Sequence, residues 1–129
     1  MLERATEIDP SNGRIWLMLA DQRRLAGDLD GAAQALAHGQ EDPSPELRTE
    51  LALVGGMIDL ARGHREAALA KFVEAQRLDP ALAQGYLFEA QARKAAGDVA
   101  AAKEALRRGL AALPGDRKLT AALSALGGL

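Results

Sequence analysis

Residues 63–80, GHREAALAKFVEAQRLDP, predict a turn, one amphipathic helix and a stop. Gly63 closes the preceding helix, and Pro80 cannot continue the new one because it lacks an amide hydrogen and clashes with the previous turn. Ala68, Phe72 and Ala75 are spaced three or four residues apart, so they share one face of the helix. The rest of the chain contains earlier and later copies of this pattern.

The first ten residues repeat the second half of this stretch. The matched pairs are Leu2 with Phe72, Ala5 with Ala75, Ile8 with Leu78, and Asp9-Pro10 with Asp79-Pro80. This match predicts that the chain begins inside a helix whose first half is missing. An excised fragment of a larger protein is expected, and a short N-terminal stub is the alternative.

Three turn glycines set a regular period. Gly27, Gly63 and Gly97 are 36 and 34 residues apart, and the two extra residues lie in the proline-rich connection at 43–45. Besides the helix within 63–80, helices are expected over residues 13–26, 29–40, 46–62, 82–96, 99–112 and 116–126. A fixed period of this size, with two helices in each unit, indicates units that must stack to bury their apolar faces.

The composition agrees with an all-α fold. Hydrophobic residues make up 48% of the 129 residues, alanine dominates and aromatic residues are only 3%. Small side chains suit closely packed helices, whereas strands favour β-branched and aromatic residues. A chain of 129 residues is in the usual range for one domain. No run approaches the roughly 18 apolar residues of a membrane span, so we expect no direct membrane insertion.

Charge and residue types argue against several functions. A formal net charge of −2 lacks the basic surplus of a nucleic-acid binder. The absence of cysteine excludes disulfides, thiolate catalysis and cysteine metal sites. His38 and His64 are too far apart in the pattern to pair, and no phosphate loop, nucleophile elbow or metal-ligand spacing occurs. We therefore expect no enzyme activity, no cofactor and no metal.

Three copies of a longer motif follow the same period. They read Trp16-x2-Leu19-Ala20-x2-Arg23 with Ala32-x3-Leu36; Ala52-x2-Gly55-Gly56-x2-Asp59 with Ala68-x3-Phe72 and Pro80; and Tyr86-x2-Glu89-Ala90-x2-Arg93 with Ala102-x3-Leu106 and Pro114. The pattern resembles the tetratricopeptide repeat (TPR) family, whose signature is Trp-x2-Leu-Gly-x2-Tyr, then Ala-x3-Phe, then Pro. The resemblance covers nearly the whole chain.

The resemblance implies an α-solenoid, a right-handed superhelix of antiparallel helix pairs. Residues 1–10 would end a truncated preceding repeat, residues 13–48, 49–82 and 83–116 would form three repeats, and residues 117–129 would form a C-terminal capping helix. In this family the first helix of each pair lines a concave groove that usually takes an extended peptide or a helix. A protein or peptide ligand is therefore the expected partner.

Groove residues follow from helix geometry once the signature positions are assigned to the interior. The predicted set is Leu17, Met18 and Asp21; Leu53, Val54, Met57 and Leu60; and Gln84, Leu87, Phe88, Gln91 and Lys94. Most are apolar, and methionine suits an adaptable interaction surface. We expect the groove to bind an apolar or amphipathic segment anchored near Leu53, Met57, Leu87 and Phe88. The alternative is that tighter packing or a flanking repeat buries these side chains.

Two departures from the signature involve charge. Arg23, Asp59 and Arg93 replace the signature tyrosine, which predicts a basic-acidic-basic ladder that fixes the register of the helices or, alternatively, contacts a partner. Glu89 stands where leucine is expected. It can reach Arg93 four residues later, which would offset part of its desolvation.

The uneven charge along the chain supports a second hypothesis. From Arg93 onward there are seven basic and three acidic residues, whereas the preceding residues include nine basic and fifteen acidic ones. Acidic early units and a basic last unit could stack end to end as a homo-oligomer, a self-association module of a larger bacterial assembly or regulatory protein. High alanine, glycine and arginine usage suggests a bacterial source. A cytoplasmic location is favoured, and the periplasm is the alternative.

Overall fold

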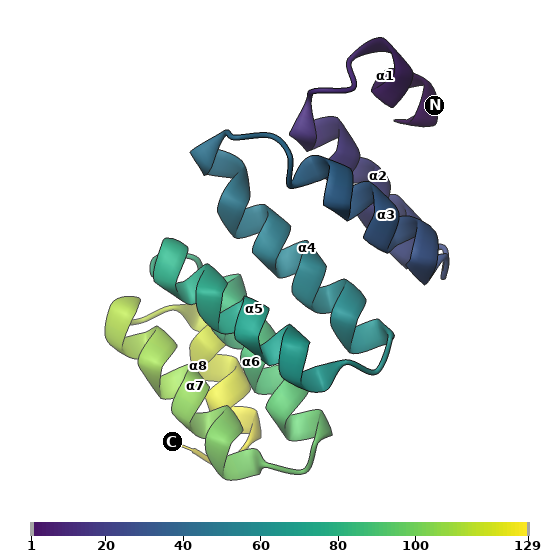
Figure 1. The fold of residues 1–129 in the computed structure, drawn as a ribbon. Helices are drawn as coiled ribbons and strands as arrows, with labels where there is room; N and C mark the ends of the chain where they lie inside the picture. Colours follow the sequence, from purple (N-terminus) through teal and green to yellow (C-terminus); the bar gives the residue numbers. More distant parts are fainter. Residues whose placement is uncertain (1, 129) are drawn as a thin grey trace. The chain divides into compact units, whose positions relative to one another are not determined.

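The chain is entirely helical in the part that the computed structural model describes, residues 2–128. These residues form eight α-helices and one 3₁₀ helix, with no strand among them (Figure 1). This confirms the all-α prediction. The chain divides into two compact units, Met1–Ala68 and Leu69–Leu129, and the division falls inside helix α5 (Arg65–Leu78).

Unit 1 is built on a helical hairpin. Its helices are α1 (Leu2–Ile8), α2 (Gly13–Leu25), α3 (Leu29–Gly39), the 3₁₀ helix η1 (Pro45–Leu47) and α4 (Arg48–Ala61). Helices α2 and α3 form an antiparallel pair, and α4 packs against both (Figure 1). The core between them is aliphatic and nearly inaccessible, with Leu19, Ala20, Ala32 and Ile58 at most 1% exposed. Ala20 and Ala32 allow the two helices of the hairpin to approach closely.

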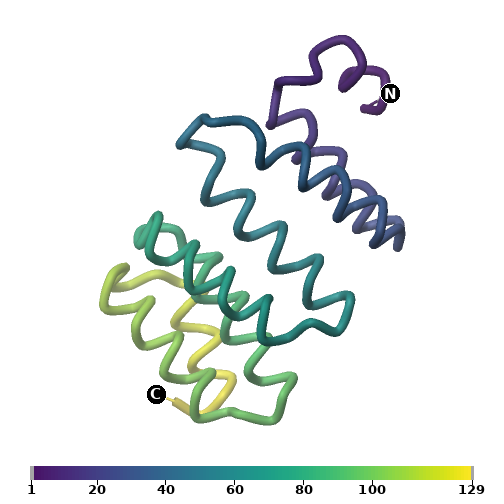
Figure 2. The backbone as a smooth tube through the Cα atoms, in the orientation of Figure 1, coloured from purple at the N-terminus to yellow at the C-terminus, as the bar shows by residue number. Residues whose placement is uncertain are grey.

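Unit 2 repeats this design. After the end of α5 it contains α6 (Ala83–Ala95), α7 (Val99–Ala112) and α8 (Arg117–Ala125), whose course Figure 2 shows as a tube. Helices α6 and α7 form the hairpin, and α8 packs against both. Ala90 and Ala102 are buried where Ala20 and Ala32 are buried in unit 1, 70 residues earlier.

Local chemistry explains where the helices begin and end. Gly27, Gly63 and Gly97 have φ angles of 85°, 82° and 84°, the left-handed conformation that ends a helix, as the sequence predicts. Asp28 and Asp98 follow two of these glycines, and each carboxylate accepts a hydrogen bond of 3.0 Å from the third amide of the next helix. The same pair of residues therefore stops one helix and starts another.

The first aromatic residue of each hairpin anchors the chain that enters it. The Trp16 Nε1–H donates to the carbonyl of Pro10 at 2.8 Å, and the Tyr86 hydroxyl donates to the carbonyl of Pro80 at 2.9 Å. The two contacts lie 70 residues apart in sequence and occupy equivalent positions in the two hairpins. They fix the angle between the proline turn and the helix that follows it.

One helix boundary and one buried position differ from the prediction. The helix expected from residue 46 begins as the 3₁₀ turn η1, and α4 proper starts at Arg48. Pro45 begins this turn, and its tighter winding carries Leu47 into the core at 3% exposure. In α1, Leu2 packs on the core, but Thr6 is buried in place of Ile8, which is 77% exposed. A hydrogen bond from the Thr6 hydroxyl to the Glu3 carbonyl permits that burial.

Candidate functional site

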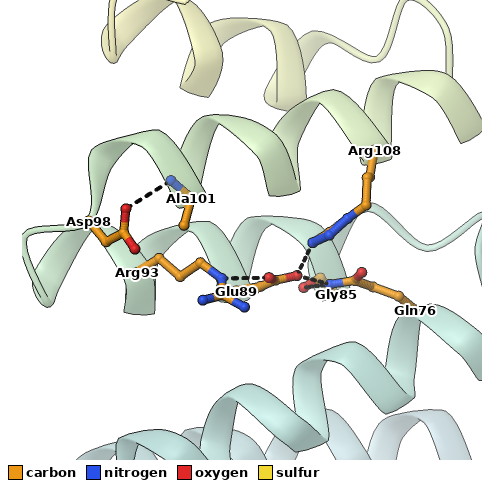
Figure 3. A network of polar contacts seen from close by, with 7 residues as sticks. All are labelled: Gln76, Gly85, Glu89, Arg93, Asp98, Ala101 and Arg108. Carbon is orange, nitrogen blue, oxygen red and sulfur yellow. Dashed lines mark hydrogen bonds and ion pairs between the residues drawn. The ribbon is translucent and has the colours of Figure 1, made fainter.

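Glu89 is the only charged side chain in the buried class among residues 2–128, with 1% exposure. It lies in the middle of α6 and accepts hydrogen bonds from three side chains on three helices (Figure 3). Gln76 Nε2 of α5 and Arg93 Nε of α6 each donate at 2.7 Å, and Arg108 Nη2 of α7 donates at 2.6 Å. The Glu89–Arg93 pair predicted from the spacing is confirmed.

The network keeps Glu89 ionised. Burial raises the pKa of Glu89, but the hydrogen bonds from Gln76, Arg93 and Arg108, together with the positive charge of Arg108, hold the pKa below its ordinary value. The Arg93 and Arg108 side chains are 31% and 48% exposed, so their outer nitrogens remain in contact with water. Glu89 therefore joins α5, α6 and α7 without leaving a buried charge unpaired.

An apolar cleft lies between α6 and α8, next to the Glu89 network on α6. It has a volume of about 210 Å³, and its apolar walls are formed by Leu87, Ala90, Leu106, Ala122, Ala125 and Leu126. A second hollow of about 370 Å³ adjoins it at Leu87 and is lined by the first residues of both helices. The starts of α6 and α8 meet at one end of this surface and their last turns meet at the other, so the two helices run in the same direction.

Small side chains keep the cleft open. Ala90 on α6 and Ala122 and Ala125 on α8 present only methyl groups, while Leu106 forms a floor that is 0% exposed. The Tyr86 ring does not fill the space because it packs on Gly109, where an added Cβ would lie 2.8 Å from Tyr86 Cγ. The surface is therefore a groove with a closed apolar floor.

Four of the predicted groove residues of unit 2 lie on this surface. Leu87, Gln91 and Lys94 line the apolar cleft, and Gln84 lines the adjoining hollow with Leu87. Phe88 does not line either of them. Its ring packs against Phe72, with centroids 5.7 Å apart and planes inclined by 40°. Phe88 thus contributes to the contact between α5 and α6.

The predicted groove residues of unit 1 are more buried than an open stripe requires. Leu17 and Val54 belong to the unit's core at 4% and 9% exposure, and Met57 packs against that core. The structure corrects the expectation of a continuous open stripe here, because α2 and α4 pack directly on each other and bury their facing side chains. Leu53 is also buried, at 7% exposure, and Leu60 is partly buried.

Polar and exposed positions complete the predicted set in unit 1. Met18 is 53% exposed, and Asp21 forms an ion pair of 2.7 Å with Arg24 one turn later. Arg23, one of the residues in the predicted charge ladder, donates from Nη1 to the carbonyl of Gly31 at 3.1 Å. The Nη2 atom of Arg23 lies 4.0 Å from Oε1 of Glu3. The ladder through Asp59 stays a prediction.

Sequence reasoning missed the contribution of α8 to the site. That helix was predicted as a cap, yet Ala122, Ala125 and Leu126 form one wall of the cleft. The available signal was the spacing of Ala122, Ala125 and Leu126, which places them on one face of the helix predicted over residues 116–126. Arg108 and Gln76 were missed for another reason, since they lie 19 and 13 residues from Glu89 and no local pattern connects them.

Other candidate chemistry is structural in character. His38 stacks on Trp16 with ring centroids 4.3 Å apart and planes inclined by 23°. Among residues 2–128 no cluster of three or more histidine, aspartate or glutamate side chains could hold a metal ion. Within the same part of the chain, no helix combines the length and apolar character needed to cross a bilayer.

Comparisons with known proteins identify the fold. No protein-family model matches the chain, and no curated protein matches it in sequence. Among solved structures, it is similar to the crystal structure of MamA, a TPR-like helical repeat protein, with a TM-score of 0.72 and 19% sequence identity. The match covers 98% of this chain and 75% of that chain. At this identity the similarity establishes the helical repeat fold alone.

Proposed function

We propose that this chain is a protein-interaction unit, and that the cleft between α6 and α8 binds the apolar side of a peptide or amphipathic helix. The observation that supports this proposal is the cleft itself. It is an open surface whose floor and walls are formed by Leu87, Ala90, Leu106 and side chains of α8. A solvent-facing apolar groove between two helices offers burial to a partner helix that presents side chains at helical spacing. Membership of the TPR family, inferred from the signature residues, is part of the same proposal.

The dimensions of the cleft favour a peptide over a small molecule. The apolar cleft, at about 210 Å³, is smaller than the roughly 300–1,000 Å³ typical of small-molecule sites, and the adjoining hollow of about 370 Å³ continues it along the two helices past Gln84, Arg117 and Lys118. It accommodates a few side chains from a segment that lies along the two helices. Gln91 and Lys94 at its edge can form hydrogen bonds to the polar side of that segment.

Filling the cleft tests the proposal. Ala125 is exposed in the last turn of α8, so Ala125→Trp should place an indole over the apolar walls without disturbing the core. We expect this variant to lose binding of peptides selected on the wild-type chain by phage display, as measured by isothermal titration calorimetry. Substitution of Phe88 is a poorer test because it would remove the contact with Phe72.

The matched control is Ala100→Trp, which introduces the same side chain at an exposed position of α7 that does not line the cleft. This variant should bind the peptides as the wild type does. Circular dichroism should show unchanged helicity for both variants. Unchanged affinity in Ala125→Trp would contradict the assignment of the site.

Self-association is the second candidate function, and the separation of charge between the units favours it. Unit 1 carries seven basic and twelve acidic residues, for a net charge of −5, whereas unit 2 carries nine basic and six acidic residues, for a net charge of +3. Opposite charges on two copies would attract at low ionic strength. Sedimentation velocity at low salt and at about 1 M salt, where the Debye length falls to about 3 Å, tests this. A monomer under both conditions would exclude self-association.

A further inference from the structure

The cleft between α6 and α8 and the hollow that adjoins it share a basic rim. Lys94 stands at the last turns of the two helices, and Arg117 and Lys118 stand at the start of α8. All three side chains are exposed, and none of them makes an ion pair within the described range 2–128. Asp116 is the one carboxylate on this surface, and it is already engaged as the N-terminal cap of α8.

These unpaired cations contrast with the other arginines of unit 2. Each of the other four pairs with a carboxylate of the same unit, as Arg77 with Glu74, Arg93 with Glu89, Arg107 with Glu104, and Arg108 with Glu89. Three of the four unit-2 cations without an ion pair in the described range, Lys94, Arg117 and Lys118, therefore place positive charge along the cleft and the adjoining hollow, and the fourth, Lys103, lies on α7 outside both. The apolar walls of the cleft strengthen the attraction of the three cations for an anionic group.

We infer that the segment bound in this cleft is an acidic amphipathic helix of a partner protein. Its apolar side chains enter the groove, and its carboxylates pair with Lys94 at one end and with Arg117 and Lys118 at the other. This inference rests on the function proposed above and specifies the chemistry of the partner. Complementary charge at the two ends would fix the position of the helix and speed its association.

The spacing of the cations sets the length of the bound segment. Helix α6 covers ten residues between Gln84, beside Arg117 and Lys118, and Lys94, which corresponds to about 15 Å at a rise of about 1.5 Å per residue. A partner helix of about three turns spans that distance. Its acidic residues would lie at both ends, with apolar residues between them three or four positions apart.

Nucleic acid fits this surface less well. Single-stranded nucleic acid requires aromatic side chains on which its bases stack, and the cleft has aliphatic walls. A second copy of the chain also carries acidic residues in unit 1, so the experiment below includes it as a separate outcome.

Peptide display on the full chain tests the inference. A library of random 16-residue peptides is selected on the wild-type chain and depleted on Ala125→Trp. The best binder is then synthesised together with a twin in which every glutamate and aspartate becomes glutamine or asparagine. Fluorescence anisotropy measures both peptides against the wild type and against the rim variant Lys94→Gln, Arg117→Gln, Lys118→Gln. The control variant Arg77→Gln, Lys103→Gln, Arg107→Gln removes the same charge from residues that do not line the cleft.

We expect enriched peptides with apolar residues at helical spacing and an acidic excess. The neutral twin should bind about tenfold more weakly, since three exposed ion pairs each contribute modestly. The rim variant should bind the acidic peptide and the twin with similar affinity. The control variant should still prefer the acidic peptide by about tenfold.

Three results would overturn the inference, and they separate it from the proposed function. If the enriched peptides have no acidic excess, or the twin binds equally well, the partner is not acidic and the cleft still binds peptides. If no peptide is enriched over Ala125→Trp, both proposals are wrong. If the chain forms salt-sensitive oligomers that the rim variant disperses, the occupant is a second copy of the chain and not a separate acidic partner.

Discussion

Glu89→Gln should destabilise the protein more than Glu89→Leu does. Glutamine keeps the shape of glutamate but replaces one acceptor oxygen with an NH₂ group, which then faces the donors of Arg93 or Arg108. Leucine removes the polar group altogether. Gln76 retains a partner in that variant because its Nε2 also donates to the Gly85 carbonyl at 3.1 Å.

The exposure of the partners sets the size of the effect. Breaking a fully buried ion pair costs about 3–5 kcal/mol, whereas single hydrogen bonds to charged groups contribute about 1.5–3 kcal/mol. Arg93 and Arg108 are 31% and 48% exposed, so water replaces part of what each loses. We therefore expect Glu89→Gln to lower the free energy of unfolding by about 1–3 kcal/mol. Glu89→Leu should change it by less than about 1 kcal/mol.

Urea unfolding followed by far-ultraviolet circular dichroism measures both values. The control is Glu104→Gln, which removes the same charge from a side chain that is 69% exposed and paired with Arg107. This control should cost less than about 0.5 kcal/mol, as is usual for surface pairs. The reasoning would be refuted if Glu89→Gln were as stable as Glu104→Gln, or if Glu89→Leu were the least stable of the three.

The depressed pKa of Glu89 gives the same prediction a pH dependence. A carboxylate with a lower pKa in the folded state contributes stability above its unfolded pKa of about 4.3 and loses that contribution as pH falls through the folded value. The free energy of unfolding of the wild type, measured relative to that of Glu89→Leu, should therefore be smaller in acid than at pH 7. An identical pH profile for the two proteins would contradict this assignment.

Two further substitutions test the packing of the hairpins by thermal melting. Gly109→Ala should lower the melting temperature, because the added Cβ would lie 2.8 Å from Tyr86 Cγ. Overpacking of this kind costs about 1–3 kcal/mol, which outweighs the gain of about 1 kcal/mol in helix propensity when alanine replaces glycine. A higher melting temperature would show that the Tyr86 ring moves aside. Trp16→Phe removes the hydrogen bond to the Pro10 carbonyl and should cost about 0.5–1.5 kcal/mol, and an unchanged melting curve would mean that this bond contributes nothing.

The helices and their ends could be predicted because they depend on neighbouring residues. The left-handed glycines Gly27, Gly63 and Gly97 and the capping aspartates Asp28 and Asp98 act within one turn of their own positions. Because these residues recur with the repeat period, the same helix ends can be predicted in each unit. The prediction was wrong by two residues at the start of α4, where the Pro45 turn winds as a 3₁₀ helix to bury Leu47.

The candidate site was only partly predictable. Helical spacing placed Leu87, Gln91 and Lys94 on one face of α6, and these residues do line the cleft. The same reasoning placed Leu17 and Val54 on an open surface, although they lie in the core of unit 1. Periodicity identifies which residues share a face, but it cannot tell whether a neighbouring helix covers that face.

Composition, turn chemistry and period were thus sufficient for an all-α chain of helical hairpins with a charge imbalance along its length. Tertiary packing alone brought Gln76 and Arg108 onto Glu89 and set α8 beside α6 to enclose an apolar cleft with Lys94 at its rim. These contacts join residues 13 or more positions apart on different helices. Their formation depends on how close the helix axes approach, and small side chains such as Ala90 and Gly109 set that distance only once the partner helix is in place.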